Sequence, residues 1–279
     1  MSKVWLITGS SRGLGRALAE AVLAAGDRVV ATARTPEQLA DLVTQYGDQV
    51  RAVALDVTNV QAAQTAVQTA VDEFGGLDVV ANNAGYANSA PIEETPDDDF
   101  RAQIETNLFG VVNVTKAALP VFREQKSGHF LQFSSIGGRV GGTPGMGAYQ
   151  TAKFAVEGFS EVLNNEVKPF GVKVTIIEPG AFRTDWGGSS MTIAPTHPDY
   201  DETVGAMNRY RVEADGSQAG DPAKAAQAIL QIVAADQPPL RLLLGTDALT
   251  RAEQGAQDRA AETSAWAHLS TSTDFSEGH

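Results

Sequence analysis

A tyrosine and a lysine spaced four residues apart are the side chains of this sequence best suited to transferring a proton. The stretch AYQTAKFAVEGFSEVLNNEV has helical periodicity, which places Tyr149 and Lys153 one turn apart on a shared face. A phenol has a pKa of about 10, so it exchanges its proton poorly near neutrality. A fixed ammonium group one turn away favours the phenolate and makes that transfer easier. The pattern is short enough to arise by chance, so its meaning rests on other signals along the chain.

A hydroxyl group upstream adds a second function to this candidate site. Ser135 ends the apolar run GHFLQFSS, fourteen residues before Tyr149. A hydroxyl there could hydrogen-bond a substrate carbonyl while the tyrosine donates the proton. The register of the preceding strand favours Ser135 over its neighbour Ser134.

A glycine-rich turn near the amino end predicts a dinucleotide site. The segment TGSSRGLG, residues 8–15, follows the apolar run VWLIT and opens the helical pattern LGRALAEAVLAAG. Gly9 allows a tight turn, Gly13 lets the backbone approach a pyrophosphate, and Gly15 lets helix and strand pack closely. The spacing is G-x-x-x-G-x-G, and an ordinary strand-to-helix turn would also satisfy this motif taken alone.

In this combination the sequence resembles the classical subgroup of the short-chain dehydrogenase/reductase family. The matching residues run from 8 to 184 in the family's order: TGSSRGLG, Asp56-Val57, Asn82-Asn83-Ala84-Gly85, Asn107, Ser135, Tyr149-x-x-x-Lys153, Pro179-Gly180 and Thr184. One departure is visible, because the segment GGRVGGTPGMGAY is one residue longer than the usual distance from serine to tyrosine.

The resemblance implies four catalytic residues. Tyr149 gives or takes the proton of the substrate oxygen, and Ser135 positions that oxygen. Lys153 lowers the tyrosine pKa and binds the nicotinamide ribose. Asn107 holds a relay water between the lysine and bulk solvent.

The resemblance also implies a set of cofactor contacts and no metal. The cofactor-binding residues are expected to be Gly9, Ser11, Arg12, Gly13, Leu14, Gly15, Arg34, Asp56, Val57, Asn83, Ala84, Gly85, Tyr149, Lys153, Pro179, Gly180, Phe182 and Thr184. The strand RVVATAR carries Ala33 and Arg34 where an acid would bind the ribose hydroxyl of NAD, so Arg34 and Arg12 imply NADP(H) rather than NAD(H). Two alternatives stay open: both arginines can be solvated surface residues, and Asp56 can be a strand-end cap instead of an adenine contact.

Composition excludes several classes of function. With 21 Lys and Arg against 34 Asp and Glu, the net charge is −13, which argues against a nucleic-acid partner. The absence of cysteine excludes disulfides, thiolate zinc sites and cysteine nucleophiles. The four histidines show no paired metal spacing: His129, His197, His268 and His279. No apolar stretch is long enough to span a bilayer and a strand begins close to the first residue, so we expect a cytoplasmic protein without a signal peptide.

Alternating strand and helix patterns predict an α/β fold over a single domain, residues 1–279. Apolar runs predict strands at 3–8, 28–33, 50–55, 77–82, 129–134, 172–177 and 240–244. Near-continuous apolar strands separated by helices predict a Rossmann-type, doubly wound, seven-stranded parallel sheet with helices on both faces; the family's strand order is 3-2-1-4-5-6-7. Helix starts are predicted at Thr35-Pro36-Glu37, Thr95-Pro96-Asp97 and Asp221-Pro222.

Two segments outside this pattern are given roles of their own. Residues 185–218 are polar and irregular, and we expect them to form a mobile substrate lid with hinges at Gly187-Gly188 and Gly205. Its apolar points are Trp186, Met191, Tyr200, Met207 and Tyr210. Residues from about 264 to 279 are expected to be a carboxyl-terminal tail.

The sequence is therefore expected to encode an NADP(H)-dependent oxidoreductase that interconverts a ketone and a secondary alcohol. The substrate is expected to be a hydrophobic small-molecule carbonyl or alcohol, and the segment 185–218 permits a sizeable one. The family also implies a homodimer or homotetramer, with the helices at 98–126 and 148–168 at the interface. Two alternatives remain: a redox sensor that binds NADP(H) without turnover, and an epimerase or dehydratase of the extended type, whose larger carboxyl-terminal domain this chain is too short to contain.

Overall fold

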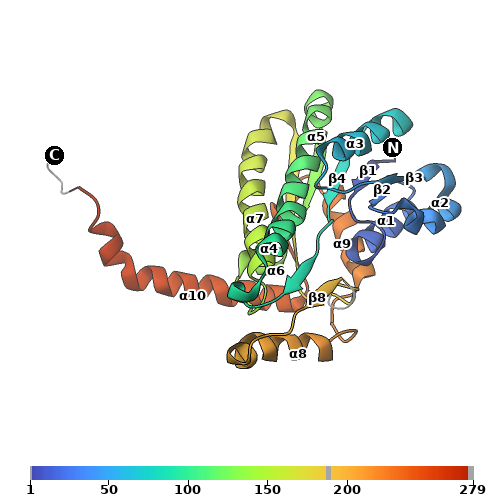
Figure 1. Ribbon diagram of the computed structural model, residues 1–279. Helices are drawn as coiled ribbons and strands as arrows, with labels where there is room; N and C mark the ends of the chain where they lie inside the picture. Colours follow the sequence, from blue (N-terminus) through green and yellow to red (C-terminus); the bar gives the residue numbers. More distant parts are fainter. Residues whose placement is uncertain (1, 187–189, 276–279) are drawn as a thin grey trace.

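A seven-stranded parallel sheet forms the centre of the molecule (Figure 1). The computed structural model describes residues 2–186 and 190–275. The sheet order is β3-β2-β1-β4-β6-β7-β9, and a separate pair is formed by β5 and β8. The strands are β1 Val4–Ile7, β2 Arg28–Ala33, β3 Val50–Ala54, β4 Val79–Asn82, β5 Ala87–Ser89, β6 Gly128–Phe133, β7 Val172–Pro179, β8 Met191–Ile193 and β9 Arg241–Leu244. With the short strands β5 and β8 set aside, the predicted order 3-2-1-4-5-6-7 is confirmed.

Helices cover both faces of the sheet because each strand is apolar on both sides. In β1, Trp5 and Ile7 join the core under α1 and α9, whereas Val4 and Leu6 join the core under α3, α5 and α7. The larger helices are α1 Gly13–Ala24, α2 Ala40–Tyr46, α3 Val60–Phe74, α4 Asp97–Ile104, α5 Gly110–Gln125, α7 Gly147–Val167, α8 Ala206–Glu213, α9 Pro222–Ala234 and α10 Thr246–Thr271. Burial on both faces is what a parallel sheet needs to shield its strands from water.

Only one of the three predicted helix starts uses its side chain as a cap. Asp221 accepts hydrogen bonds from the amides of Ala223 and Lys224 at the start of α9, as predicted. Thr35 lies at the start of a short 3-10 helix, but its hydroxyl makes no capping hydrogen bond. Thr95 does not cap α4, because its hydroxyl donates to the Pro91 carbonyl within the preceding turn.

A π turn, Glu105–Phe109, joins α4 to α5 in one continuous helical stretch. Such turns contain one more residue than an α-helical turn and are frequent at functional sites. This one contains Asn107, whose side chain is fully buried. The turn is the local structure that points this polar residue into the molecule.

The segment predicted as a lid is more ordered than the sequence indicated. Its described part contains β8, which pairs with β5, and the helix α8. Gly205 is the last residue of a π turn directly before α8. The other two expected hinge residues, Gly187 and Gly188, lie outside the described residues.

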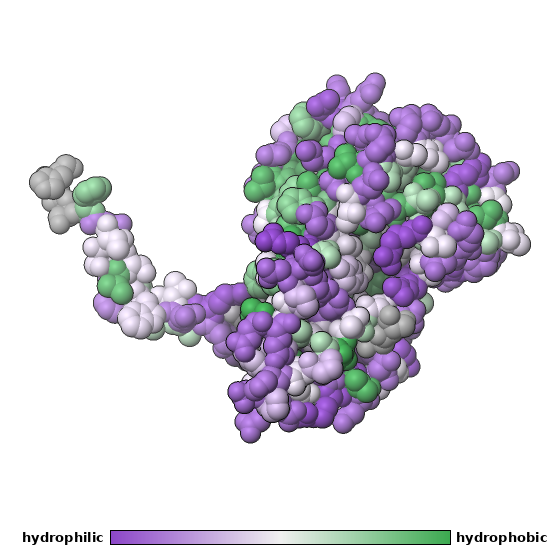
Figure 2. All heavy atoms as spheres, in the orientation of Figure 1, coloured by the Kyte–Doolittle hydropathy of each residue, from purple (hydrophilic) through white to green (hydrophobic). Residues whose placement is uncertain are grey.

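The last long helix, α10, stands clear of the body in Figures 1 and 2. It includes the first part of the predicted tail, residues 264–271, as regular helix. Its inner end packs through Ala248 and Ala252, and its outer half is exposed. Among the described residues, no helix combines the length and apolar character that crossing a membrane would need.

Candidate active site

The carboxyl ends of β1, β4, β6 and β7 bring the predicted site residues to one edge of the sheet. The glycine turn follows β1, Asn83-Ala84-Gly85 follows β4, Ser135 follows β6, and Gly180 follows β7. In a doubly wound sheet this edge carries the ligand crevice. Tyr149 and Lys153 reach it from α7.

The glycine turn has the conformation and packing that the sequence predicts. Gly9 and Gly13 have φ angles of +69° and +60°, a region that side chains disfavour. A Cβ on Gly15 would collide with the Gly9 carbonyl and the Asn83 amide. The turn leads into α1, whose N-cap residue Arg12 forms no side-chain capping hydrogen bond. The first amides of α1 therefore face the crevice without a side-chain cap, as an anion site requires.

Thr8 fixes this turn to the end of β4. Its hydroxyl oxygen accepts hydrogen bonds from the amides of Asn83 and Ala84, both at 2.9 Å. The Asn83 side-chain amide in turn donates to the carbonyls of Thr8 and Gly9. Asn82 serves a different purpose, since its buried amide donates to Thr115 and Gln132 between β4, α5 and β6.

Two exposed arginines lie at the carboxyl end of β2 and at the glycine turn, where the adenosine of a dinucleotide is expected. Arg34 follows β2 and Arg12 precedes α1. Neither forms an ion pair within residues 2–186 and 190–275, whereas the neighbouring Arg16 is bound to Glu20 and Asp41. Asp56 accepts hydrogen bonds from the amide and hydroxyl of Thr58, so it acts as the strand-end cap that the sequence left open. Its carboxylate is exposed at the same edge.

Tyr149 and Lys153 are buried next to each other in α7. Tyr149 is 8% exposed and Lys153 is 4% exposed. The Lys153 ammonium lies 5.6 Å from the centre of the Tyr149 ring and donates to the Phe133 carbonyl at 2.7 Å. Burial raises the pKa of Tyr149 to about 12, against a hydrogen bond from Ser135 that lowers it. Burial lowers the pKa of Lys153 to about 8, and the charge of Glu157 opposes that shift. Near neutrality the pair is therefore a protonated phenol beside an ammonium.

The structure separates the two serines after β6. Ser135 starts α6 (Ile136–Arg139), accepts a hydrogen bond from the Gly137 amide at 3.0 Å and lies within hydrogen-bonding reach of Tyr149. Ser134 is buried and its hydroxyl faces the Lys153 carbonyl. The longer segment before Tyr149 includes Gly142 and Gly145, both with positive φ angles.

Asn107 ties the π turn to the chain that follows β4. Its side-chain amide donates to the carbonyls of Tyr86 (2.8 Å) and Gln103 (2.9 Å), and its oxygen accepts from the Tyr86 amide. A Cβ on Gly85 would collide with the Asn107 oxygen and lie 3.6 Å from the Lys153 nitrogen. Gly85, Asn107 and Lys153 thus meet at one point.

The chain after β7 closes the crevice from the opposite side. Gly180 packs against the carboxylate of Asp247, which also accepts a hydrogen bond from the Ala181 amide. Thr184 lies across from the glycine turn, 3.6 Å from where a Cβ of Gly13 would stand. Phe182 pairs with Gly220 and packs against the core under α1 and α9. Thr184 thus places this segment next to the glycine turn.

An apolar cluster packs against Tyr149. The ring of Trp186 packs on the Tyr149 ring with centroids 5.3 Å apart. Met146, Met191 and Ile193 complete the cluster. Of the other expected apolar lid residues, Tyr210 is exposed and does not belong to this cluster.

A buried polar network that the sequence did not reveal holds α8 in place. Arg211 donates to Ser89, to Asn208 and to the Pro144 carbonyl, at 2.9, 2.7 and 3.0 Å. Ser89 also donates to Asn208 at 2.6 Å. These residues are far apart in the chain and match no local motif, so only the fold brings them together.

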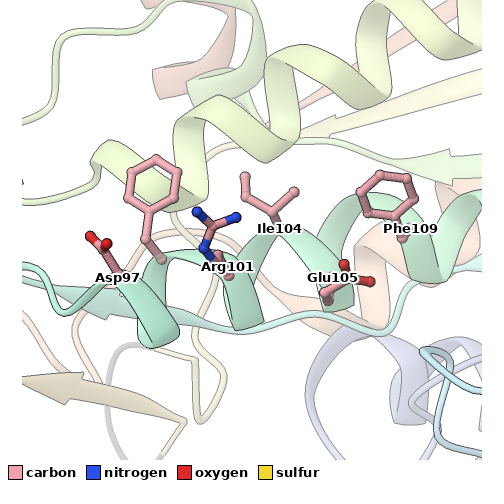
Figure 3. A pocket seen from close by; sticks show the side chains of 6 residues that line it. Asp97, Arg101, Ile104, Glu105 and Phe109 are labelled. Atoms are coloured by element: carbon pink, nitrogen blue, oxygen red, sulfur yellow. The ribbon is translucent and has the colours of Figure 1, made fainter.

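A surface hollow of about 350 Å³ lies away from these residues, on α4 and the π turn (Figure 3). Its lining is apolar at Phe100, Ile104 and Phe109 and charged at Asp97, Arg101 and Glu105. The π turn thus faces two ways, with Asn107 inward and Phe109 outward. The hollow belongs to a helix surface and contains none of the expected catalytic side chains.

Comparison with known proteins identifies the family. The model of the short chain dehydrogenase family matches residues 3–192, more than half of the chain. The chain belongs to the short-chain dehydrogenase family. Oxidoreductase BOA17 of Botryotinia fuckeliana (strain B05.10) is 52% identical to it over 271 residues, which cover 97% of this chain and 98% of that protein.

Solved structures of other short-chain dehydrogenases agree with the fold. The crystal structure of a short-chain dehydrogenase from Streptomyces avermitilis is 42% identical, with a TM-score of 0.91 over 98% of this chain and 100% of that chain. A short chain dehydrogenase from Burkholderia cenocepacia J2315, solved in complex with NADP, is 27% identical with a TM-score of 0.74 over 94% of this chain and 96% of that one. The family resemblance read from the sequence is confirmed.

Proposed function

We propose that this short-chain dehydrogenase reduces an apolar ketone to a secondary alcohol, and catalyses the reverse reaction, with NADP(H). The observation that carries the proposal is the buried pair of Tyr149 and Lys153 beside Ser135. A protonated phenol and a neighbouring hydroxyl can both donate hydrogen bonds to the same carbonyl oxygen. A structural role alone would not require a lysine buried without a carboxylate bound to its ammonium.

The residues of the glycine turn fit a dinucleotide. The uncapped amides of α1 suit a pyrophosphate, and the glycines leave its backbone open to close approach. Arg34 and Arg12 would hold a 2′-phosphate, Asp56 and Val57 the adenine, and Gly85 and Lys153 the nicotinamide ribose. Thr184, Phe182 and Gly180 would border the nicotinamide. The bound nicotinamide would supply the hydride for the carbonyl carbon.

The protein's own residues perform the proton chemistry. Ser135 donates a hydrogen bond to the substrate oxygen, and Tyr149 gives that oxygen its proton. The Lys153 ammonium stabilises the phenolate that results. Asn107 holds the π turn open next to Lys153, where a water molecule can return the proton from solvent.

The apolar cluster around Tyr149 supports a hydrophobic substrate. Trp186, Met191 and Ile193 present rings and alkyl groups and offer no charged partner to a substrate. We further propose that the surface formed by α4, α5 and α7 joins two copies of the chain. It carries the hollow of Figure 3 and the exposed apolar side chains Phe109, Phe154 and Val162.

Turnover of NADPH with a panel of ketones tests the proposed function. We expect the wild type to oxidise NADPH with an apolar ketone, and Tyr149→Phe to lose turnover by at least about a hundredfold, as for loss of a general acid. Because the phenol is a minor cofactor contact, the dissociation constant for NADPH should stay within about threefold. Tyr210→Phe, at an exposed tyrosine of the lid, is the matched control and should behave as the wild type.

Each other outcome selects a different function. NADPH binding without turnover on any ketone would favour the redox-sensor alternative. Turnover in Tyr149→Phe close to that of the wild type would overturn the assigned mechanism.

A further inference from the structure

Four ionisable side chains follow one face of α7 at intervals of four residues. Tyr149 and Lys153 occupy the reacting end, and Glu157 and Glu161 follow on the next two turns. The first three are buried, with 8%, 4% and 7% of their surface exposed. Only Glu161 reaches solvent.

Glu157 belongs to a buried ion cluster behind the active site. Arg241 of β9 lies 3.0 Å from Glu157 and 3.3 Å from Glu178 of β7, and it also pairs with Glu161. Arg139 of α6 lies 3.2 Å from Glu178. The cluster thus contains three carboxylates and two guanidinium groups from four elements, and Lys153 is the next ionisable group along α7.

One oxygen of Glu157 is not used by the cluster. Its Oε2 atom binds Arg241, whereas its buried Oε1 atom has no hydrogen-bond partner in the described part of the chain. A carboxylate that served only the ion pair would satisfy both oxygens. The charge of Glu157 also raises the pKa of Lys153 against the effect of burial. The same charge helps to raise the pKa of the buried Glu178 to about 7.

We propose that Glu157 is a positioning residue. Its negative charge keeps Lys153 in the ammonium form beside Tyr149 at the pH where the reaction runs. The proposal rests on the proposed function, in which that ammonium stabilises the phenolate. Arg241 fixes the carboxylate on the inner face of α7, and Lys153 lies one turn away on that face, towards the reacting end. Glu157 acts on Lys153 through the electrostatic field of its carboxylate, because no hydrogen bond joins the two side chains among the described residues.

The loss of the Glu157 charge should shift the pKa of Lys153 in one direction only. Replacing Glu157 by glutamine removes a negative charge, which lowers the pKa of any neighbouring group. In alcohol oxidation kcat/KM should fall at high pH as Lys153 loses the proton that makes it an ammonium. This upper limb of the pH profile should move to lower pH, by about half to one unit. A side chain that only supported the fold would lower the rate without moving the limb.

The test compares kcat/KM against pH for three variants and the wild type. Glu157→Gln should move the upper limb to lower pH, and Glu157→Asp, which keeps the charge, should restore it. Glu161→Gln is the matched control, because it removes another carboxylate bound to Arg241 on the same helix, two turns from Lys153. Its upper limb should stay within about 0.2 unit of the wild type. Should Glu157→Gln fail to fold, Glu157→Met removes the charge while filling the same volume.

A second readout does not depend on turnover. The ¹³Cε signal of Lys153, assigned by its loss in Lys153→Arg, reports the protonation of the ammonium directly. In Glu157→Gln this signal should titrate at lower pH than in the wild type. An unchanged titration would overturn the inference even if activity fell. A wild type without turnover would overturn the proposed function instead, and the lysine titration would still decide the role of Glu157.

Discussion

At the scale of single residues, burial acts in opposite directions on two neighbouring groups. It raises the pKa of Tyr149 and lowers that of Lys153, because it disfavours the charged form of each. Near neutrality the phenol keeps its proton and the lysine keeps most of its charge. These protonation states are the ones that the proposed proton donation to a carbonyl oxygen needs.

At the other end of the crevice, the predicted choice of cofactor rests on charge. We expect NADPH to be preferred over NADH, since Arg34 and Arg12 are exposed and not engaged by acids in the described residues. The net charge of −13 opposes the more anionic cofactor, so local contacts must overcome it. Charge-assisted hydrogen bonds contribute roughly 1.5–3 kcal/mol each, which is about tenfold or more in affinity.

The prediction is tested with Arg34→Ala. The kcat/KM for NADPH should fall severalfold or more, and that for NADH should stay nearly unchanged. Arg16→Ala is a suitable control, because Arg16 already pairs with Glu20 and Asp41. A wild type that uses NADH better, or a variant that loses both cofactors equally, would show that Arg34 does not bind the 2′-phosphate.

The sequence predicted the pairs of residues that share one element, and much less of the contacts between elements. Tyr149 and Lys153 could be placed together because a helix fixes their spacing. Thr8 lies within the predicted glycine motif, yet its hydrogen bonds to Asn83 and Ala84 join two strands. The cluster of Glu157, Glu178 and Arg241 likewise needs the sheet order before it can be seen.

At the scale of elements, one partly buried arginine holds α8. Arg211 links it to β5 and to the chain before α7, on the side of the crevice where Trp186 covers Tyr149. The partly buried guanidinium makes several hydrogen bonds that no shorter side chain could replace. If residues 185–218 form the proposed lid, its position therefore depends on Arg211.

Arg211→Ala should loosen the lid. We expect a several-fold higher KM for the ketone with a smaller change in kcat, and faster proteolysis within residues 185–218. Saturating cofactor and substrate should slow that cleavage in the wild type. Arg209→Ala, two residues away on the exposed side of α8 and paired only with Asp201 in the described structure, should change neither quantity. Equal cleavage rates in Arg211→Ala and the wild type would show that Arg211 does not hold residues 185–218 in place.

The elements themselves were predicted to different degrees. All seven strands of the large sheet were expected, because buried parallel strands are continuous apolar runs. The short strands β5 and β8 and the helix α8 were not, since their sequences are polar and their order comes from contacts such as that of Arg211 with Ser89. The cap expected at Thr95 failed because its hydroxyl is used by the preceding turn.

At the scale of the whole molecule, a buried histidine links stability to pH. His129, near the start of β6, is 4% exposed, and its Nε2 atom lies 2.9 Å from the Thr175 hydroxyl. Burial and the charges of Lys173 and Lys3 lower its pKa to about 4 from its ordinary value near 6.5. Between these values the unfolded chain binds a proton that the folded chain does not.

The folded state should therefore lose stability as the pH falls from 7 to 5. The contribution of His129 is about 2 kcal/mol over this range. Glu178, whose pKa is raised by burial, acts in the opposite direction, so the comparison must be made between the wild type and His129→Gln. The difference in unfolding free energy, measured with urea, should fall by that amount between pH 7 and pH 5, whereas His268→Gln at an exposed site should follow the wild type. A constant difference would contradict the prediction.

The π turn at Glu105–Phe109 changes the direction in which side chains point along one long helix. An α-helix advances about 100° per residue, so one additional residue rotates everything before the turn relative to everything after it. The hydrophobic stripe of α5 can then face the sheet while Asn107 points towards Tyr86 and the apolar side chains of α4 face outward. A deletion of one residue here would leave the helix intact and the composition almost unchanged. It would nevertheless rotate the Asn107 amide and the outward-facing side chains of α4 out of position together. An insertion or deletion in this helix therefore cannot change one of them without changing the other.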